Sequence, residues 1–252
     1  MLYLVNERQK EIIYKVNELD KVSVADLAKE LAVSVVTIRH DLNFLEQNGY
    51  LKREHGFAVT VDSDNLDVRM KVNFPLKQKI AEYAASLVQN DEHIFIEGGS
   101  ANALLAQHLA YTKRITLITS SYYIAQLLKN TDLKVIVIGG EYQKSSDSVV
   151  GELACLAIQH LHFDRAFIGI DGFTQQTGFT GRNEMRTQLV NTILTQPGEN
   201  IIITDSSKFG QIQHDAIEPL NAINRVITDL KINALDEEYL SRQGIIVDKV
   251  AV

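Results

Sequence analysis

The sequence has little of several features that mark particular classes of protein. Only one of its 252 residues is cysteine, Cys155. A single cysteine excludes an internal disulfide framework and a zinc site of several cysteines, and it fits a reducing compartment. No apolar run approaches the roughly 18 to 20 residues that cross a bilayer, and the first residues become charged too early for a secretory signal. We therefore expect a cytoplasmic protein without a membrane partner.

An excess of positive charge and a disorder-prone composition are absent as well. The chain has 25 basic and 32 acidic residues, a formal net charge of -7, which argues against binding nucleic acid through bulk charge. Any contact with DNA must therefore be local. With 45% hydrophobic residues, 23% charged residues and three prolines, the composition is that of a folded protein. The length fits one large domain, or a small domain followed by a medium one.

The first fifty residues carry the pattern of three helices. Apolar residues at helical spacing predict an amphipathic helix over residues 6–19. Ser23 is a candidate N-cap for a second, short helix, because a side-chain oxygen there can accept an amide of the first turn. Ser34 is a candidate N-cap for a third helix, which runs to about Asn48 and stops at Gly49.

The third helix has two chemically different faces. A rotation of about 100° per residue places three apolar side chains on one side: Ile38, Leu42 and Leu45. The opposite side carries donors, acceptors and one small apolar group: Val36, His40, Asn43 and Gln47, flanked by Thr37 and Arg39. Such a mixture suits the reading of base edges and the binding of phosphates. A short helix followed by a longer one is also the order of a helix-turn-helix, whose second helix lies in the major groove.

A short hairpin is predicted directly after these helices. Residues 50–54 and 57–61 are two strand-like runs on either side of His55 and Gly56. Lys52, Arg53 and His55 lie near its tip. We expect this hairpin to act as a wing against the DNA backbone.

One segment of this chain, SVADLAKELAVSVVTIRHDLNFLEQNGYLKREHGFA, resembles the N-terminal winged helix of the DeoR family of bacterial transcription regulators. The family signature S-x-x-T-[IV]-R-R-D-L-x-x-L-E is matched by Ser34, Thr37, Ile38, Arg39, Asp41, Leu42, Leu45 and Glu46. His40 stands where the family has a second arginine, and the wing has one glycine, Gly56, where many members have two. The resemblance implies a winged helix-turn-helix domain over residues 1–60. The candidate DNA contacts are Ser34, Val36, Thr37, Arg39, His40, Asn43, Lys52, Arg53 and His55. A small helical domain for protein contacts is the alternative.

The rest of the chain has a different pattern. Residues 61–75 are polar and end at Pro75, which predicts a linker. Beyond it, helices are predicted at 76–89, 101–110 and 122–129, and strands at 93–97, 115–119, 134–138, 166–170, 200–204, 225–228 and 244–247. Short apolar runs between helices are typical of βαβ units. We therefore predict an α/β fold with a mostly parallel sheet over residues 76–252.

Glycines, hydroxyls and charged groups follow the predicted strands. In open parallel sheets ligands bind beyond the carboxyl ends of the strands. Backbone amides at a helix start, hydroxyls, a lysine and carboxylates together suit a phosphorylated sugar or polyol. The candidate effector-binding residues are Gly98, Gly99, Ser100, Thr119, Ser120, Ser121, Gly140, Asp171, Glu184 and Lys208. Turn residues and helix caps are the alternative for any one of them.

This second part also resembles a known domain. Its motifs are the loop at Gly98–Ser100, Gly139-Gly140-Glu141, Gly151, FIGIDG at 167–172, NEMR at 183–186 and SSKFG at 206–210. They are similar to those of the DeoR effector domain, which is related in fold to ribose 5-phosphate isomerase and the CoA-transferase group. The resemblance implies that Ser100, Ser120, Asp171, Glu184 and Lys208 surround a sugar phosphate.

An enzymatic role is the main alternative. Asp171 and Glu184 could be imagined as the base of an aldose-ketose isomerase, but the acid and lysine motifs of that isomerase are not recognised beyond the Asp171 turn. Cys155 has the apolar neighbours of a buried core thiol. His160 and His162 alternate ahead of a strand, which is more typical of opposite sheet faces than of a metal site. We expect no catalytic residue, no metal and no cofactor.

The sequence thus predicts a DNA-binding transcriptional regulator, a repressor in our interpretation, whose operator binding responds to a phosphorylated sugar or related metabolite. An isomerase-like or transferase-like enzyme with an appended helix-turn-helix is the second hypothesis, and a protein-interaction adaptor is the third. Because one winged helix touches few base pairs, specific binding to double-stranded DNA normally needs two or more copies. We expect a homodimer or homotetramer assembled through the C-terminal domain.

Overall fold

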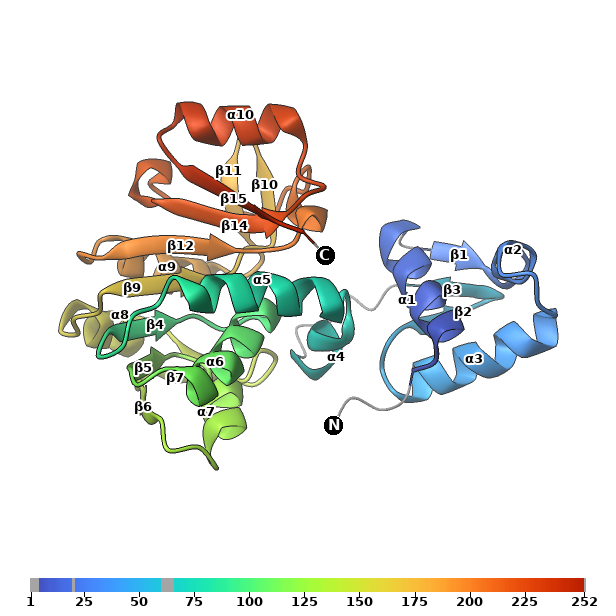
Figure 1. The fold of residues 1–252 in the computed structure, drawn as a ribbon, viewed down its shortest axis with the longest axis horizontal. Coiled ribbons are helices and arrows are strands. Elements are labelled where there is room, and N and C mark those ends of the chain that lie inside the picture. Colours follow the sequence, from blue (N-terminus) through green and yellow to red (C-terminus); the bar gives the residue numbers. More distant parts are fainter. Residues whose placement is uncertain (1–4, 20, 60–65, 252) are drawn as a thin grey trace. The chain divides into compact units, whose positions relative to one another are not determined.

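A computed structural model describes residues 5–19, 21–59 and 66–251 of the chain. The chain divides into two compact units, Met1–Phe74 and Pro75–Val252 (Figure 1). The linker predicted over 61–75 is wrong in part, because helix α4, Leu66–Lys71, lies within it and helix α5, Phe74–Ser86, begins before its end. Pro75 stands in the first turn of α5, where a missing N–H costs nothing. Residues 61–65 lie outside the described residues.

The first unit contains three helices and a small antiparallel sheet. Its elements are α1 Glu7–Leu19, β1 Lys21–Ser23, α2 Val24–Glu30, α3 Val35–Gln47, β2 Lys52–Glu54 and β3 Phe57–Val59. The strand order is β1-β3-β2. The three predicted helices and the wing hairpin are confirmed, although residues 60 and 61 of the predicted wing lie outside the described residues. β1 was missed, because three residues become a strand only by pairing with β3.

Both predicted N-caps are present in this unit. The Ser23 hydroxyl accepts the Asp26 amide at 3.0 Å, and the Ser34 hydroxyl accepts the Thr37 amide at 3.1 Å. Each cap satisfies an amide that the helix itself cannot pair. The predicted inner face of α3, formed by Ile38, Leu42 and Leu45, is fully buried. It packs in one apolar cluster with Ile12 and Val16 of α1 and Leu27 of α2. The helical period thus predicted this small core.

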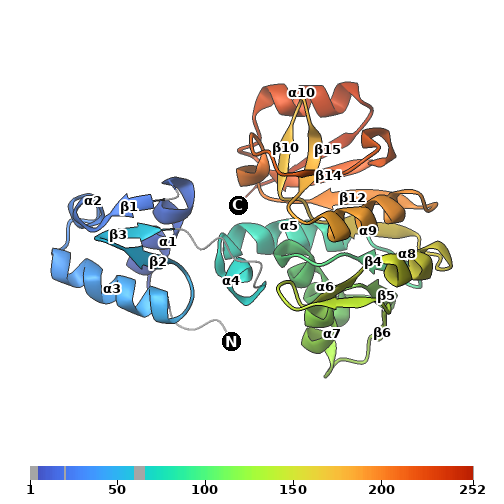
Figure 2. The same cartoon turned by 180° about the vertical axis from the view of Figure 1, so that it is seen from behind.

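The second unit is built on a parallel sheet of seven strands (Figures 1 and 2). The strands are β4 His93–Ile96, β5 Thr116–Thr119, β6 Lys134–Val137, β9 Arg165–Ile168, β12 Glu199–Ile203, β14 Arg225–Asp229 and β15 Ile246–Val250. Their order in the sheet is β15-β14-β12-β9-β4-β5-β6. The predicted α/β class is confirmed. The last strand begins after the predicted Gly244, because that residue has φ of 81° and lies in the turn behind a helix.

Helices cover both faces of this sheet. Besides α5 they are α6 Ser100–Thr112, α7 Tyr122–Leu128, α8 Glu152–Gln159, α9 Glu184–Leu194 and α10 Ala234–Arg242. Figure 1 shows α5, α6 and α7 in front of the sheet, and Figure 2 shows α8 and α9 in front of it. Side chains of α8, α9 and α10 share one apolar core with alternate strand residues such as Phe95, Ala166 and Ile168. Because helices bury both faces of the sheet, the sequences of the strands are nearly continuous apolar runs.

Five short strands at the rim of the sheet were not predicted. The first two form a hairpin, β7 Glu141–Gln143 and β8 Ser148–Val150. The others form a three-stranded antiparallel sheet of β10 Gly172–Thr174, β11 Gly178–Gly181 and β13 Asp215–Ala216. Strands of two to four residues leave little period-2 signal, so the sequence did not reveal them. Two single 3-10 turns complete the unit, Ser206–Lys208 and Leu220–Ala222.

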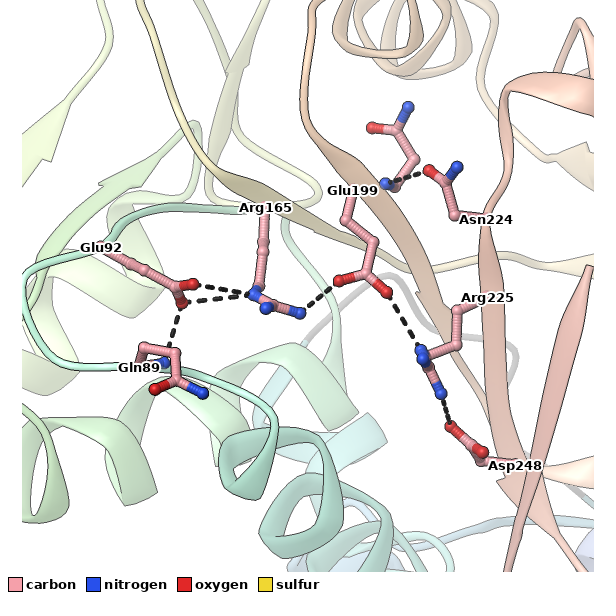
Figure 3. A network of polar contacts seen from close by, with 8 residues as sticks. Gln89, Glu92, Arg165, Glu199, Asn224, Arg225 and Asp248 are labelled. Atoms are coloured by element: carbon pink, nitrogen blue, oxygen red, sulfur yellow. Dashed lines mark hydrogen bonds and ion pairs between the residues drawn. The ribbon is translucent and has the colours of Figure 1, made fainter.

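A chain of charged side chains crosses the amino ends of several strands (Figure 3). Arg165 lies between Glu92 at 3.2 Å and Glu199. Glu199 also accepts from Arg225 at 3.1 Å, and Arg225 pairs with Asp248. Burial acts to lower the pKa of Arg225, but the hydrogen bonds to Asp248 and Glu199 outweigh it and raise that pKa above its ordinary value. Glu199 is thus the carboxylate that joins the two arginines.

We expect the substitution Glu199→Gln to destabilise the protein by about 1 to 3 kcal/mol, because hydrogen bonds to charged groups contribute in this range. The amide keeps one acceptor oxygen and places an NH₂ group against the second arginine. Urea unfolding of the full chain measures the loss. Glu238→Gln is the matched control, since Glu238 pairs with Arg242 on an exposed helix surface and should contribute less than about 0.5 kcal/mol. Equal losses in the two variants would contradict a structural role for this charge chain.

Candidate DNA-binding surface and effector site

The outer face of α3 is exposed as predicted. Val36 is 74% exposed although it is apolar. Arg39, His40, Asn43 and Ser34 are exposed as well. Thr37 is half-buried, and its hydroxyl lies 2.9 Å from that of Ser34. The structure therefore leaves a cation, an imidazole, an amide and an isopropyl group on one helix surface, which is a set that can contact base edges and phosphates.

The wing is tied to the outer face of α3. The Arg53 guanidinium donates to Asn43 Oδ1, and the Arg53 amide donates to Glu46 Oε1 at 2.8 Å. Two candidate DNA contacts are therefore bonded to each other. His55 and Gly56 both have positive φ, 46° and 88°, which is the backbone of a tight two-residue hairpin turn. This bonding sets the position of the wing relative to the helix.

A buried carboxylate anchors α3 from its inner side. Asp41 is 2% exposed and accepts from Gln9 Nε2 at 2.9 Å and from Arg8 Nε at 2.6 Å. The hydrogen bond to Asp41 raises the pKa of Arg8. In the sequence, Asp41 stood out only as part of the family signature. Its position beside Leu42, on the buried side of the helical period, was the available signal for a structural role.

The topology of the large sheet defines where a ligand site is expected. From the centre, β4, β5 and β6 follow one another in one direction, and β9, β12, β14 and β15 follow in the other. The order therefore reverses between β4 and β9. Open parallel sheets bind ligands at the carboxyl ends of the strands at this switch point.

The structure brings together several predicted residues at this point. Glu97, 8% exposed, accepts the Gly169 amide at 3.3 Å and so links the ends of β4 and β9. Asn102 Nδ2 donates to the Glu97 carbonyl at 2.8 Å. A Cβ on Gly98 would lie 3.8 Å from that of Ser121, so the loop after β4 touches the loop after β5. The first turn of α6, with Ser100, starts from this loop.

Several predicted effector contacts are engaged in the fold itself. The Thr119 hydroxyl donates to the Ile96 carbonyl at 2.6 Å, and the Ser121 hydroxyl caps α7 by accepting the Ile124 amide at 3.2 Å. Both side chains are fully buried. Gly140 packs so closely that an added Cβ would lie 2.8 Å from the Val150 carbonyl. These three residues therefore have structural roles at the ends of β5 and β6.

Two lysines surround a buried carboxylate at the end of β12. Asp205 is 3% exposed, and its Oδ2 lies 3.9 Å from Lys77 Nζ. Burial acts to raise the pKa of Asp205, but Lys77, Lys208 and hydrogen bonds from Ser207 outweigh it and hold that pKa below its ordinary value. The carboxylate is therefore charged at neutral pH. Lys208 was predicted at this edge.

Lys77 is a residue of this edge that sequence analysis missed. It is 7% exposed and comes from α5, where its neighbours on the helix face are Ile80, Ala81 and Ala84. Lys77 occupies the first position of an apolar stripe with helical spacing (i, i+3, i+4, i+7). That position predicts a buried lysine, and a buried lysine needs a partner.

The loop after β9 reaches the start of α9. Asp171 Oδ2 accepts the Arg182 amide at 3.2 Å, and the Asp171 amide donates to the Thr180 carbonyl. Glu184, the other predicted carboxylate, is exposed in the first turn of α9. The N-cap of α9 is Asn183, whose Oδ1 accepts from the Arg186 amide and from Gln143, each at 3.1 Å. Arg182 and Arg186 were not among the predicted site residues.

The remaining candidates of the sequence have structural surroundings. Cys155 is 9% exposed within α8 and belongs to the large apolar core. His162 lies 3.9 Å from Asp164, and both are largely exposed. Among the residues that the structure describes, no group of three or more histidine, cysteine, aspartate or glutamate side chains is placed to hold a metal ion. Within the same ranges no helix is long and apolar enough to cross a membrane.

Comparison with solved structures finds remote similarities of fold. A ribose 5-phosphate isomerase A from Methanocaldococcus jannaschii has a TM-score of 0.40 and 20% identity, over 54% of this chain and 55% of that chain. The translation initiation factor eIF-2B of Pyrococcus horikoshii has a TM-score of 0.47 and 12% identity, over 86% of each chain.

Comparison of sequences finds much closer relatives. The HTH-type transcriptional regulator GolR of Listeria innocua is 35% identical over 90% of this chain and 91% of its own length. A putative aga operon transcriptional repressor of Escherichia coli O157:H7 is 29% identical, over 95% and 92%. The L-fucose operon activator of Haemophilus influenzae is 28% identical, over 96% and 98%.

Two family descriptions match the chain in succession. The DeoR-like helix-turn-helix domain covers residues 8–64, and the DeoR C terminal sensor domain covers residues 72–230. These matches agree with the capped recognition helix, the wing and the parallel sheet. The chain therefore belongs to the DeoR family of DNA-binding transcriptional regulators.

Proposed function

We propose that this regulator is a cytoplasmic repressor that binds operator DNA as a homodimer or homotetramer, and that a phosphorylated sugar or related metabolite weakens this binding. The observation that carries the proposal is the exposed polar face of α3 beside the wing. In the second unit, glycine loops and two lysines lie at one edge of the large sheet. No covalent step is required of any residue.

On the DNA side, each exposed group of α3 has a chemical counterpart in the major groove. Arg39 can donate both of its forked N–H groups to guanine O6 and N7. Val36 suits the methyl group of thymine, and Asn43 suits adenine, once Arg53 turns from Asn43 to a phosphate. Lys52 and His55 lie on the wing, where phosphate oxygens are the expected partners.

The substitution Arg39→Ala is expected to weaken operator binding by about 1 to 3 kcal/mol, because a bidentate contact to guanine contributes in this range. Discrimination at the contacted guanine should be lost together with the affinity. A quantitative mobility shift at fixed salt measures both. Arg242→Ala removes the same charge from an exposed helix surface of the second unit and should bind as the parent does. An unchanged affinity of the Arg39→Ala variant for the operator would show that Arg39 does not contact a base.

On the effector side, the site is proposed at the switch point of the large sheet. The amides of Gly98 and Gly99 and the start of α6 favour an anion, and Lys208, which follows β12 at the same edge of the sheet, adds a positive charge. Asp171 offers a carboxylate for sugar hydroxyls. The curated relatives support a sugar, because their names refer to an aga operon and an L-fucose operon.

A mobility shift with the DNA upstream of the protein's own gene tests the whole proposal. We expect specific binding, measured against unrelated DNA, that one compound from a panel of sugar phosphates releases. Specific binding that every compound leaves unchanged would keep the operator function and refute the sugar-phosphate effector. Absence of specific binding at low salt would refute the proposed operator binding.

A further inference from the structure

An acidic side chain lies on the DNA-binding face of α3. Glu46 is in the last turn of the helix, three residues after Asn43, and both side chains are exposed. Residues at this spacing lie on the same face of a helix. A carboxylate at the C-terminal end of a helix opposes the helix dipole, and a carboxylate near DNA repels its phosphates. The charge of Glu46 therefore opposes both the helix and the binding of DNA.

The contacts of Glu46 are with the wing. Its Oε1 atom accepts the backbone amide of Arg53 at 2.8 Å, and its Oε2 atom lies 4.0 Å from Nη1 of the Arg53 guanidinium. The strand that carries Arg53, β2, is at the edge of the three-stranded sheet. Edge strands have backbone groups that no neighbouring strand pairs. Glu46 thus ties the edge strand of the wing to α3.

Different groups hold the backbone and the side chain of Arg53. Its backbone amide is bonded to Glu46, whereas its guanidinium donates to Asn43 Oδ1. Arg53 and Asn43 are both exposed, so DNA can replace the second bond with a phosphate on Arg53 and a base on Asn43. The bond between the Arg53 amide and Glu46 does not take part in that exchange. The wing therefore keeps its place on the helix while the guanidinium changes partner.

We propose that Glu46 is a positioning residue for operator recognition, which raises the affinity for the operator although its charge opposes the binding of DNA. The inference rests on the proposed function, in which α3 contacts base edges and the wing contacts phosphates. Both sets of contacts form together only when the wing is held at a fixed place beside α3. Unrelated DNA is bound through its phosphates, so it gains less from a fixed wing and is still repelled by the carboxylate.

Three variants of the full-length protein test this inference, with the DNA upstream of its own gene and an unrelated duplex as probes. We expect Glu46→Ala to bind the operator about three- to tenfold more weakly than the parent, because a hydrogen bond is lost. It should bind the unrelated duplex as tightly as the parent or more tightly. Glu46→Gln keeps an acceptor oxygen and should recover most of the lost operator affinity. Glu54→Ala is the matched control, because it removes an exposed carboxylate from β2 and should weaken the binding of neither duplex.

The salt dependence of binding separates positioning from a loss of folding. When the wing is no longer held, the slope of log affinity against log salt should fall by about 0.9 for the operator, the value of one phosphate contact. Weaker binding of both duplexes in the same proportion, with the slope of the parent, would show a merely structural role and overturn the inference. Tighter operator binding by Glu46→Ala would overturn it as well, and so would a glutamine variant as weak as the alanine variant. Absence of specific binding by the parent protein would refute the proposed function itself, and the inference with it.

Discussion

Replacement of Asp41 by alanine is expected to weaken operator binding, because it destabilises the winged-helix unit. The side chain joins α1 to α3 through Gln9 at 2.9 Å and Arg8 at 2.6 Å. Gln9 is itself buried, so its amide would lose its partner without gaining water. The Arg8 side chain is 37% exposed, so solvent screening reduces the contribution of its ion pair with Asp41 to stability. Together the loss should amount to about 2 to 3 kcal/mol.

This loss is large for so small a unit. Folded domains are stable by about 0.05 to 0.15 kcal/mol per residue, which is roughly 3 to 9 kcal/mol for some sixty residues. Circular dichroism during urea unfolding measures the stability, and a mobility shift measures operator binding. Glu11→Ala removes an exposed carboxylate from α1 and should change neither. A stable Asp41→Ala variant that binds the operator normally would refute the anchoring role.

The substitution Lys208→Met should leave operator binding intact and make the effector far less able to release it. A hydrogen bond between charged partners contributes about 1.5 to 3 kcal/mol, so the effector concentration for half-release should rise roughly ten- to hundredfold. A titration of the protein–operator complex with the active sugar phosphate measures the shift. Lys129→Met, at the exposed C-terminal end of α7, is the matched control. Half-release at the same effector concentration as in the parent protein would show that Lys208 does not bind the phosphate.

The same variant carries a consequence for acid stability. The pKa of Asp205 lies below its ordinary value in the folded protein, so its contribution to stability is present above the unfolded pKa and is lost as the pH falls through the folded one. Lys208 helps to lower that pKa. Its removal should therefore move the acid-induced loss of stability to higher pH, which unfolding curves at a series of pH values would show.

Local chemistry alone determined much of this protein. The hydroxyls of Ser23 and Ser34 mark where α2 and α3 begin, because capping depends on neighbours three residues away. The helical period separates the buried Ile38 from the exposed Arg39. Apolar runs between helices predicted the parallel sheet, and topology rules predict a ligand site at its carboxyl edge. The family resemblance extended these local patterns to a function.

Only the tertiary structure decided which of the polar residues at that edge remain available. Thr119 and Ser121 looked like effector contacts in the sequence, yet their hydroxyls bond to a neighbouring strand and to α7. Lys77 was not predicted at this edge, yet it lies beside Asp205, from a segment far along the chain. Arg182 was not singled out in the sequence, and Arg186 entered only as the last residue of the NEMR motif. A hydrogen bond or an ion pair between distant segments depends on how strands and helices pack, and local sequence does not encode that distance.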